Sequence, residues 1–340
     1  MLKLRTFRSA PLALAYWLGL AGSAQREHDC ARILMLHGVP RRNAPALERA
    51  LRYLQRHFDI VPLDSLAAAA ARRERLSRQV AITFDDGLRN NVEVAYPILR
   101  ALGAHATFFL CPQLIDDGGW LWNHEMRQRL RRLHSLHELA ACTGGPRALE
   151  PFVDWMKDLE LPRRKEVEAA VRAATPNFAA TAEERHDYEL ASWDDLRRLD
   201  PRVIAFGSHT LTHPILPGLD AASLEREVAH SRRLLEDRLQ RVVRLFAYPN
   251  GDVNPAVRDR VRASYLAAVT TEEDCVRPGC DPYLLPRVNV PRDVLRFVLA
   301  LHRVAPSSAS GSQVASSGNS VMIAMQASIR KKNGSEAPAT

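Results

Sequence analysis

The chain has 340 residues, of which 46% are hydrophobic, 25% charged and 6% aromatic, and its formal net charge is +8. These fractions are typical of a globular protein and exclude a collagen-like, disulfide-dense or wholly disordered chain. Residues 1–24 contribute +3 and residues 305–340 contribute +2, so the central part is only weakly basic; because it also has no zinc-finger or RNP-type motif, we expect no nucleic-acid partner.

Residues 1–27 have the composition of a targeting or membrane-contact segment. A basic stretch is followed by an apolar run over 11–24 that ends in Ala-Gly-Ser-Ala. This run is shorter than the roughly 20 residues that a transmembrane helix needs, and two interpretations stay open: a secretory signal peptide, or an uncleaved segment lying on a membrane surface. Both predict a place in the bacterial cell envelope. Cys275 and Cys280 flank a short loop and could pair in an oxidising compartment.

Between residues 28 and 304, short apolar runs typical of strands alternate with helical patterns. The seven expected strands are Arg32–Leu36, Val80–Phe84, Ala106–Leu110, Val203–Phe206, Val242–Tyr248, Tyr265–Val269 and Leu284–Val290. Alternating strands and helices predict βαβ units and a parallel sheet, and about seven such units favour an irregular (β/α) barrel. We therefore expect an α/β fold with one domain over 28–304, followed by a disordered Ser-rich tail over 305–340.

Residues 120–200 interrupt this alternation with a mostly helical insertion after the third strand. An insertion at that point lies over the C-terminal face of a barrel and forms a lid or a substrate wall. Trp122 stands near its start, and two interpretations are open for it: packing on a sugar face or packing in a core.

Polar side chains gather where the predicted strands end, which is the face on which barrels build active sites. His37 ends the first strand, and Asp85 and Asp86 end the second. Adjacent carboxylates at a strand end point in different directions, so one can bind a metal while the other faces the substrate. His209 and His213 follow the fourth strand; on one helical turn, a spacing of four places both rings on one face, where they can share a metal.

The fifth strand ends in Phe246-Ala247-Tyr248-Pro249-Asn250-Gly251. A backbone N–H beside the fixed φ of Pro249 could face a substrate oxygen there. In their order, TFDDG (83–87), HTLTH (209–213) and FAYPNG (246–251) resemble the motifs of the NodB-like polysaccharide deacetylases, a family of metal-dependent carbohydrate esterases. The resemblance covers roughly residues 30–300. Within the family, the chain is similar to the circularly shifted type found among poly-N-acetylglucosamine deacetylases.

This resemblance implies a NodB-type barrel and a role for each motif. Asp86, His209 and His213 are implied to bind a divalent metal, with zinc as the first candidate and cobalt, nickel or manganese as alternatives. Asp85 is implied to be the catalytic base. The segment at Tyr248 and Pro249 is implied to bind the substrate, with a nearby backbone N–H holding the oxyanion.

Two positions depart from the family's common pattern. Relatives usually supply a proton donor from a Leu-x-His motif on a late strand, whereas the late candidate here, His302, falls in an expected helix. We favour His37 instead, because the first and last strands of a closed barrel are neighbours. Ala247 stands where many relatives have an arginine that steadies the catalytic Asp, and we expect Arg287 on the last strand to fill that role; the alternative is that Arg287 pairs with a surface acid.

The activity that these features predict is hydrolysis of an N-acetyl or other N-acyl group from the amino sugars of a polysaccharide. The alternatives are a deformylase or deacetylase of an undecaprenyl-linked sugar, and a catalytically silent glycan-binding protein. The expected partners are therefore a glycan or lipid-linked sugar and, through the N-terminus, a membrane surface. We expect a monomer.

Overall fold

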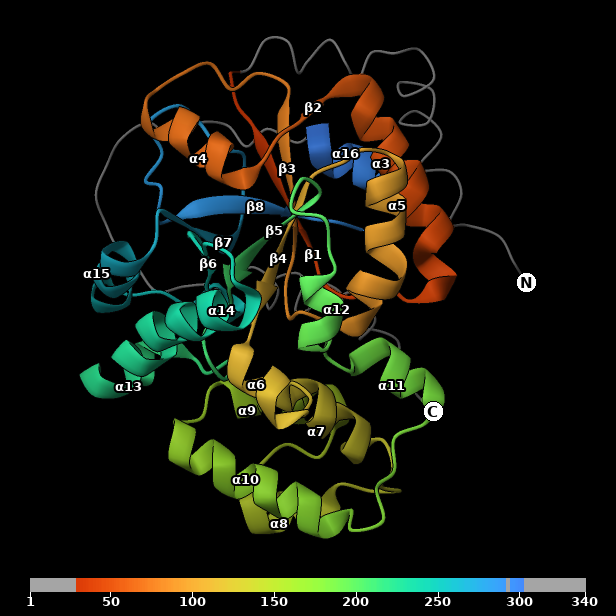
Figure 1. The fold of residues 1–340 in the computed structure, drawn as a ribbon. Helices are drawn as coiled ribbons and strands as arrows, with labels where there is room; N and C mark the ends of the chain where they lie inside the picture. The colour runs from red at the N-terminus through yellow and green to blue at the C-terminus, as the bar shows by residue number, and fades with distance from the viewer. Residues whose placement is uncertain (1–28, 292–293, 303–340) are drawn as a thin grey trace, which may run out of the picture. The chain divides into compact units, whose positions relative to one another are not determined.

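The structure is a computed structural model that describes residues 29–291 and 294–302, so the predicted N-terminal segment and the Ser-rich tail lie outside the described residues. Seven parallel strands close into a barrel (Figure 1). They are β1 (Arg32–Leu36), β3 (Gln79–Phe84), β4 (Ala106–Leu110), β5 (Ile204–Ser208), β6 (Leu245–Ala247), β7 (Ala267–Glu273) and β8 (Leu285–Asn289). Their order is β1-β8-β7-β6-β5-β4-β3, and β3 pairs back onto β1. The predicted barrel of about seven parallel strands is confirmed.

The differences from the predicted strands lie at strand ends. The strand β2 (Asp59–Ile60) is not among the predicted ones, because two residues beside the start of β3 are too short to give an apolar run. The fifth predicted strand shrinks to the three residues of β6. By contrast, β7 continues past the apolar residues to Glu273, where it pairs with β8 across an irregularity in the register. Hydrophobicity therefore locates the seven barrel strands but neither the short β2 nor the residue at which backbone pairing stops.

Helices and short turns on the outside of the barrel bury one face against the strands (Figure 1). The helices are α3 (Ala44–His57), α4 (Leu63–Ala71), α5 (Tyr96–Ala101), α6 (Pro112–Asp117), α13 (Ala221–Glu225), α14 (Ser231–Leu239), α15 (Pro255–Ser264) and α16 (Val294–His302). The turns are η2 (Arg41–Asn43), η3 (Asn91–Ala95), η4 (Leu216–Gly218), η5 (Arg226–His230) and η6 (Pro249–Gly251). In α3, Leu47, Leu51 and Leu54 recur at helical spacing and all three are buried in the main core. Within the described part of the chain, no helix is long and apolar enough to cross a membrane.

The insertion after β4 has a hydrophobic core of its own. Its helices are α7 (Trp122–Leu130), α8 (His137–Thr143), α9 (Leu149–Lys157), α10 (Leu161–Ala174), α11 (Ala182–Tyr188) and α12 (Trp193–Arg197). Trp122, Met126 and Phe152 are buried together in it, and Figure 1 shows α7 to α10 gathered in one group. The predicted helical insertion after the third predicted strand is confirmed.

The cysteine contacts differ from the predicted ones. The Cys280 sulfur accepts a hydrogen bond from the backbone N–H of Arg277 (3.2 Å), and Cys275 instead forms a side-chain hydrogen bond with Cys30. Cys30 and Cys275 flank an antiparallel bridge between positions 31 and 276. All five cysteines are free thiols in this structure.

Candidate active site

The two adjacent acids occupy a tight turn at the end of β3. The N–H of Asp85 donates to the Leu36 carbonyl (2.9 Å), which extends the pairing of β3 with β1 by one residue. Asp86 then has φ +75° and Gly87 φ +68°. At Gly87 a Cβ atom would lie only 2.8 Å from a Leu110 side-chain carbon, so the turn packs directly on β4 and requires glycine. The left-handed Asp86 is strained backbone of the kind that collects at functional sites.

Asp85 is held by Arg287 inside the barrel. The two terminal guanidinium nitrogens, Nη1 and Nη2, donate to the carboxylate, one to each oxygen and each at 2.8 Å. Asp85 is 2% exposed and Arg287 is 0% exposed. Arg287 also donates to the Thr270 carbonyl (2.7 Å) and to the Thr83 hydroxyl (3.2 Å), which fixes its orientation. Burial alone would raise the pKa of Asp85, but the charges of Arg287 and the neighbouring histidines outweigh it and hold this pKa well below its usual range. Arg287 thus contacts a buried acid, not a surface one.

Asp86, His209 and His213 form the group whose donor atoms could bind a metal. Their ligand atoms all lie within 4.8 Å of one another, and all three side chains are buried. The Nε2 atoms of His209 and His213 lie 3.7 and 3.8 Å from one Asp86 oxygen. These separations exceed a hydrogen bond and are close to the roughly 3.4 Å expected between two ligands of one tetrahedral cation.

The two histidines reach this position from a loop, and the predicted helical turn is wrong. Thr210 and His213 have φ +68° and φ +59°, which no right-handed helical turn allows. The Thr210 hydroxyl accepts a hydrogen bond from the His213 N–H (2.9 Å), so the loop curls back on itself and brings the two rings to a centroid distance of 4.8 Å. Two left-handed residues in a loop, Thr210 and His213, therefore bring the two rings together, which a helical turn was expected to do.

Glu227 holds this loop in place, and no motif in the sequence indicates it. Its carboxylate accepts hydrogen bonds from the N–H groups of Leu211 and Thr212, both at 2.9 Å, and from the Thr212 hydroxyl at 2.7 Å. Glu227 lies in η5, a single π-helical turn between α13 and α14, and is buried. Such π-turns are frequent at functional sites. In the sequence, Glu227 lies between Leu224 and Val228, on the apolar side of the expected helix. A charged residue in that position is the signal that could have indicated its role.

The donor set fits a divalent cation. One carboxylate and two imidazoles leave coordination positions open for other ligands, as in catalytic zinc sites. The Nδ1 atom of His209 lies 2.8 Å from the Ala247 carbonyl, so this nitrogen carries the proton and Nε2 is free to bind. Burial lowers the pKa of His213 to about 3, so its ring is neutral, as a ligand must be.

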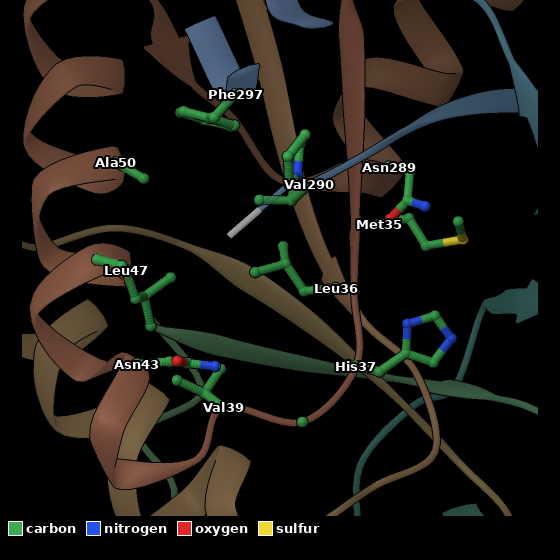
Figure 2. A pocket seen from close by; sticks show the side chains of 13 residues that line it. Met35, Leu36, His37, Val39, Asn43, Leu47, Ala50, Asn289, Val290 and Phe297 are labelled. Carbon is green, nitrogen blue, oxygen red and sulfur yellow. The ribbon is translucent and has the colours of Figure 1, made fainter. Parts of the chain in front are cut away.

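His37 lies on the side of β1 that faces the two acids. Its charge is among the causes that lower the pKa values of both Asp85 and Asp86, so it is close to them. An apolar cavity of about 280 Å³ also begins at His37, between α3 and the ends of β1 and β8. Figure 2 shows that Leu36 and Val290 point into the space beside α3, whereas His37 points to the opposite side of β1. Asp86, His209 and His213 are not among the residues that line this cavity.

His124 is a further residue of this region that the sequence did not indicate. It comes from α7, at the start of the insertion, and packs on the ring of Tyr188 at a centroid distance of 4.9 Å. Its Nδ1 is buried without a hydrogen-bond partner among the described residues, and burial lowers its pKa, while the nearby Asp86 opposes that shift. The insertion therefore contributes a buried imidazole whose pKa is influenced by the charge of Asp86. No family motif surrounds this histidine in the sequence.

Four further residues considered in the sequence analysis are Tyr248, Pro249, Trp122 and His302, and the structure places them as follows. Tyr248 is fully buried, its hydroxyl donates to the Tyr283 carbonyl (3.1 Å), and its N–H donates to the Val269 carbonyl (3.2 Å). That N–H is therefore paired within the barrel. Pro249 begins η6 directly after it. Trp122 packs in the insertion core, with the Arg164 guanidinium 4.6 Å above its ring, and His302 is the last residue of α16.

Comparisons with known proteins agree with this geometry. Residues 72–269 match the family model described as polysaccharide deacetylase. YxkH of Bacillus subtilis (strain 168) is 21% identical over 212 residues, which is 62% of this chain and only about half (51%) of that protein. Among solved structures, the Streptococcus pyogenes deacetylase PplD in complex with acetate has a TM-score of 0.55 at 16% identity, with 81% of this chain and 98% of that chain covered. IcaB from Ammonifex degensii has a TM-score of 0.54 at 18% identity, with 81% and 97% covered. At such identities the structural likeness shows the fold.

Proposed function

This chain belongs to the polysaccharide deacetylase family, and from that premise we propose that it hydrolyses the N-acetyl, or another N-acyl, group of amino sugars in a glycan. The observation that carries the proposal is the buried Asp86–His209–His213 group beside an acid that Arg287 keeps ionised. A silent glycan-binding protein would need neither the three ligands nor the strained backbone that presents Asp86.

The proposed roles follow from the contacts. Asp86, His209 and His213 would hold the cation, with zinc as the first candidate. When bound, a divalent cation supplies Lewis-acid polarisation of the acyl carbonyl and a more acidic water. Asp85 accepts the proton of the attacking water, because Arg287 keeps it ionised and each of its oxygens retains a free lone pair.

A proton must then reach the departing amine nitrogen as the C–N bond breaks, and we assign this step to His37. Its position at the end of β1, close to both acids, is compatible with that transfer. Because the Tyr248 N–H is bonded to Val269, a substrate oxygen near Pro249 would need another donor. His124 is neutral and buried on the insertion side, where it could orient the acyl group by a hydrogen bond.

The experiment is acetate release from N-acetylated chito-oligosaccharides and poly-N-acetylglucosamine by the full chain loaded with zinc or cobalt. We expect release by the parent, and no release by Asp85→Asn that still binds the metal. An Asp194→Asn variant, altered on the exposed side of α12, is the matched control. The proposal fails if the metal-loaded parent releases no acyl group from any of these glycans; retained glycan binding in that case would favour the silent alternative.

A further inference from the structure

Cys30 and Cys275 form a buried thiol pair before the start of β1, whereas the two acids of the candidate active site follow the end of the parallel strand β3. Ala31 and Val276 exchange two backbone hydrogen bonds, of 2.9 and 3.0 Å. Side chains alternate along each of these segments, so the preceding residues, Cys30 and Cys275, both point to the other face. They are 3% and 1% exposed, and their side chains share a hydrogen bond. Two thiols are thus held in contact where the chain enters the barrel.

Arg32 places a buried positive charge against this pair. It is only 1% exposed, and among the described residues it makes no ion pair with a carboxylate. Its Nη1 donates to the Cys30 sulfur (3.1 Å) and carbonyl (3.2 Å), its Nε donates to the Leu301 carbonyl (2.7 Å), and its Nη2 is buried without a partner in the described chain. A buried guanidinium without a counter-charge is costly. Of the groups that accept from Arg32, only the Cys30 sulfur can lose a proton and supply that charge.

The two thiols therefore differ in acidity. The hydrogen bond from Cys275 and the charge of Arg32 outweigh burial and lower the pKa of Cys30 to about 6. The same pairing, together with burial, raises the pKa of Cys275 well above its usual range. At pH 7 a thiolate thus stands beside a protonated thiol. Reactive cysteines have such a lowered pKa beside a cation, and redox-active ones often have a second thiol next to them.

The other described cysteines lack this arrangement. Cys111 is fully buried, and burial raises its pKa well above its usual range. Cys142 on α8 is exposed, and its sulfur donates to the Leu139 carbonyl (3.2 Å). The Cys280 sulfur accepts from the backbone N–H of Arg277 (3.2 Å). Neither of these two contacts is with a charged group or with a second thiol, so they serve as internal comparisons for Cys30.

Access to the Cys30 sulfur in the folded chain favours a small oxidant. Cys30 is almost completely buried, but Asp29 next to it is exposed, so the sulfur lies close to the surface. Hydrogen peroxide is little larger than water and suits such a narrow approach, whereas a bulky disulfide reagent does not. The thiolate, not the thiol, is the form that attacks a peroxide oxygen.

We propose that Cys30 reacts with hydrogen peroxide and that Cys275 converts the product into a disulfide. The Cys30 sulfur attacks one peroxide oxygen, the O–O bond breaks, and a sulfenic acid forms while hydroxide leaves. The Cys275 sulfur then attacks the Cys30 sulfur, and its proton leaves with the sulfenic hydroxyl as water. The two sulfurs thereby give two electrons to the peroxide. The disulfide ties the start of the barrel to the connection between β7 and β8 and removes the negative charge beside Arg32.

The test exposes the folded full chain to hydrogen peroxide at pH 7, followed by alkylation under denaturing conditions and peptide mapping. We expect a Cys30–Cys275 disulfide that forms at least about tenfold faster than Cys142 is oxidised, because a thiol with the ordinary pKa of about 8.5 is ionised to only about 3% at pH 7. In Cys275→Ser the sulfenic acid at Cys30 should persist and be trapped by dimedone.

Two arginine variants separate the effect of the buried charge from that of surface charge. Arg32→Gln should slow the oxidation of Cys30 by about tenfold or more, because the cation that favours the thiolate is gone. Arg75→Gln is the matched control: Arg75 is exposed and donates to the Ser77 hydroxyl (3.2 Å), in the loop that contacts Asp29. This variant should keep the parental rate.

Three results would overturn the inference: oxidation of Cys142 while Cys30 and Cys275 remain thiols, a disulfide between Cys275 and Cys280, or a folded Arg32→Gln variant that is oxidised at the parental rate. The parent and Cys275→Ser decide the question even if Arg32→Gln does not fold. No measurement here uses acetate release, a metal or a glycan. The redox inference and the proposed function can therefore fail independently of one another.

Discussion

Replacing Arg287 by Met removes the cation that neutralises a fully buried acid. Asp85 and Arg287 are 2% and 0% exposed and share two hydrogen bonds of 2.8 Å, so water cannot replace the lost partner. Breaking such a pair by removing one member costs about 3–5 kcal/mol. That is a large part of the roughly 5–15 kcal/mol by which a typical protein is stable. We therefore expect Arg287→Met to lower the free energy of unfolding of the metal-free protein by about this amount at pH 7.

The loss should depend on pH in a defined direction. In the parent the pKa of Asp85 is depressed, so its stabilising effect is complete above the unfolded pKa of about 3.9 and is lost only as the pH falls through the folded value. Without Arg287, burial dominates and raises the Asp85 pKa above the unfolded value. Relative to the parent, the variant then regains stability as the pH falls, by up to about 1.4 kcal/mol per pH unit.

The assay is urea unfolding of the chelator-treated protein at pH 7 and pH 5, for the parent, Arg287→Met, Asp85→Asn and the double variant. The double-mutant cycle should give a coupling energy of about 1–3 kcal/mol between the two side chains. Arg202→Met, which removes an exposed partner of Asp200, is the control and should change stability by less than about 1 kcal/mol. A loss at Arg287 no larger than at Arg202, or a coupling energy near zero, would show that the pair does not hold Asp85.

Three further predictions concern residues around the site. Glu227→Gln keeps the shape of the side chain but removes the charge that accepts three hydrogen bonds from the loop of His209 and His213. We expect metal affinity, measured by chelator competition, to fall about tenfold or more. An unchanged affinity would show that the loop keeps its conformation without this charge. Because burial lowers the pKa of His213 to about 3, the unfolded chain binds a proton there below about pH 6.5 that the folded chain does not. Through this group the free energy of unfolding of the metal-free protein should fall by about 1.4 kcal/mol per pH unit from pH 6 to 5. In the same urea series, His213→Gln should show a shallower dependence on pH. Oxidised glutathione added to the folding chain should form a disulfide between Cys30 and Cys275, the hydrogen-bonded pair. The two thiols lose two protons and two electrons, which convert one oxidised glutathione into two glutathione thiols. Peptide mapping that found Cys275 joined to Cys280 would refute this.

The sequence predicted the barrel because seven apolar runs typical of strands alternate with helical patterns, and several of these runs end in polar residues. Parallel strands bring those ends to one face, which is why His37 comes close to the adjacent acids Asp85 and Asp86 although it is distant from them along the chain. The pairing of Arg287 with Asp85 was also within reach, since an arginine on the last strand of a closed barrel is adjacent to the first strands.

What the sequence could not predict depends on backbone conformation and on distant packing. The left-handed Thr210 and His213 follow from the local loop, and a β-branched residue there is the opposite of what propensity favours. Glu227 and His124 act from other elements, η5 and α7, and their contribution appears only when those elements are folded onto the barrel. Pairing of the Tyr248 N–H with Val269 is likewise a matter of strand register, which a short apolar run does not specify.

The dependence of acetate release on metal stoichiometry tests most directly whether Asp86, His209 and His213 form a catalytic metal site. Chelator-treated protein is titrated with zinc while acetate release from an N-acetylated chito-oligosaccharide is followed. We expect the rate to rise from near zero, level off at one equivalent, and stay near zero for His209→Ala at the same zinc concentrations. Full activity in the metal-free parent, or equal activation of His209→Ala, would show that these three residues do not hold the metal that the reaction requires.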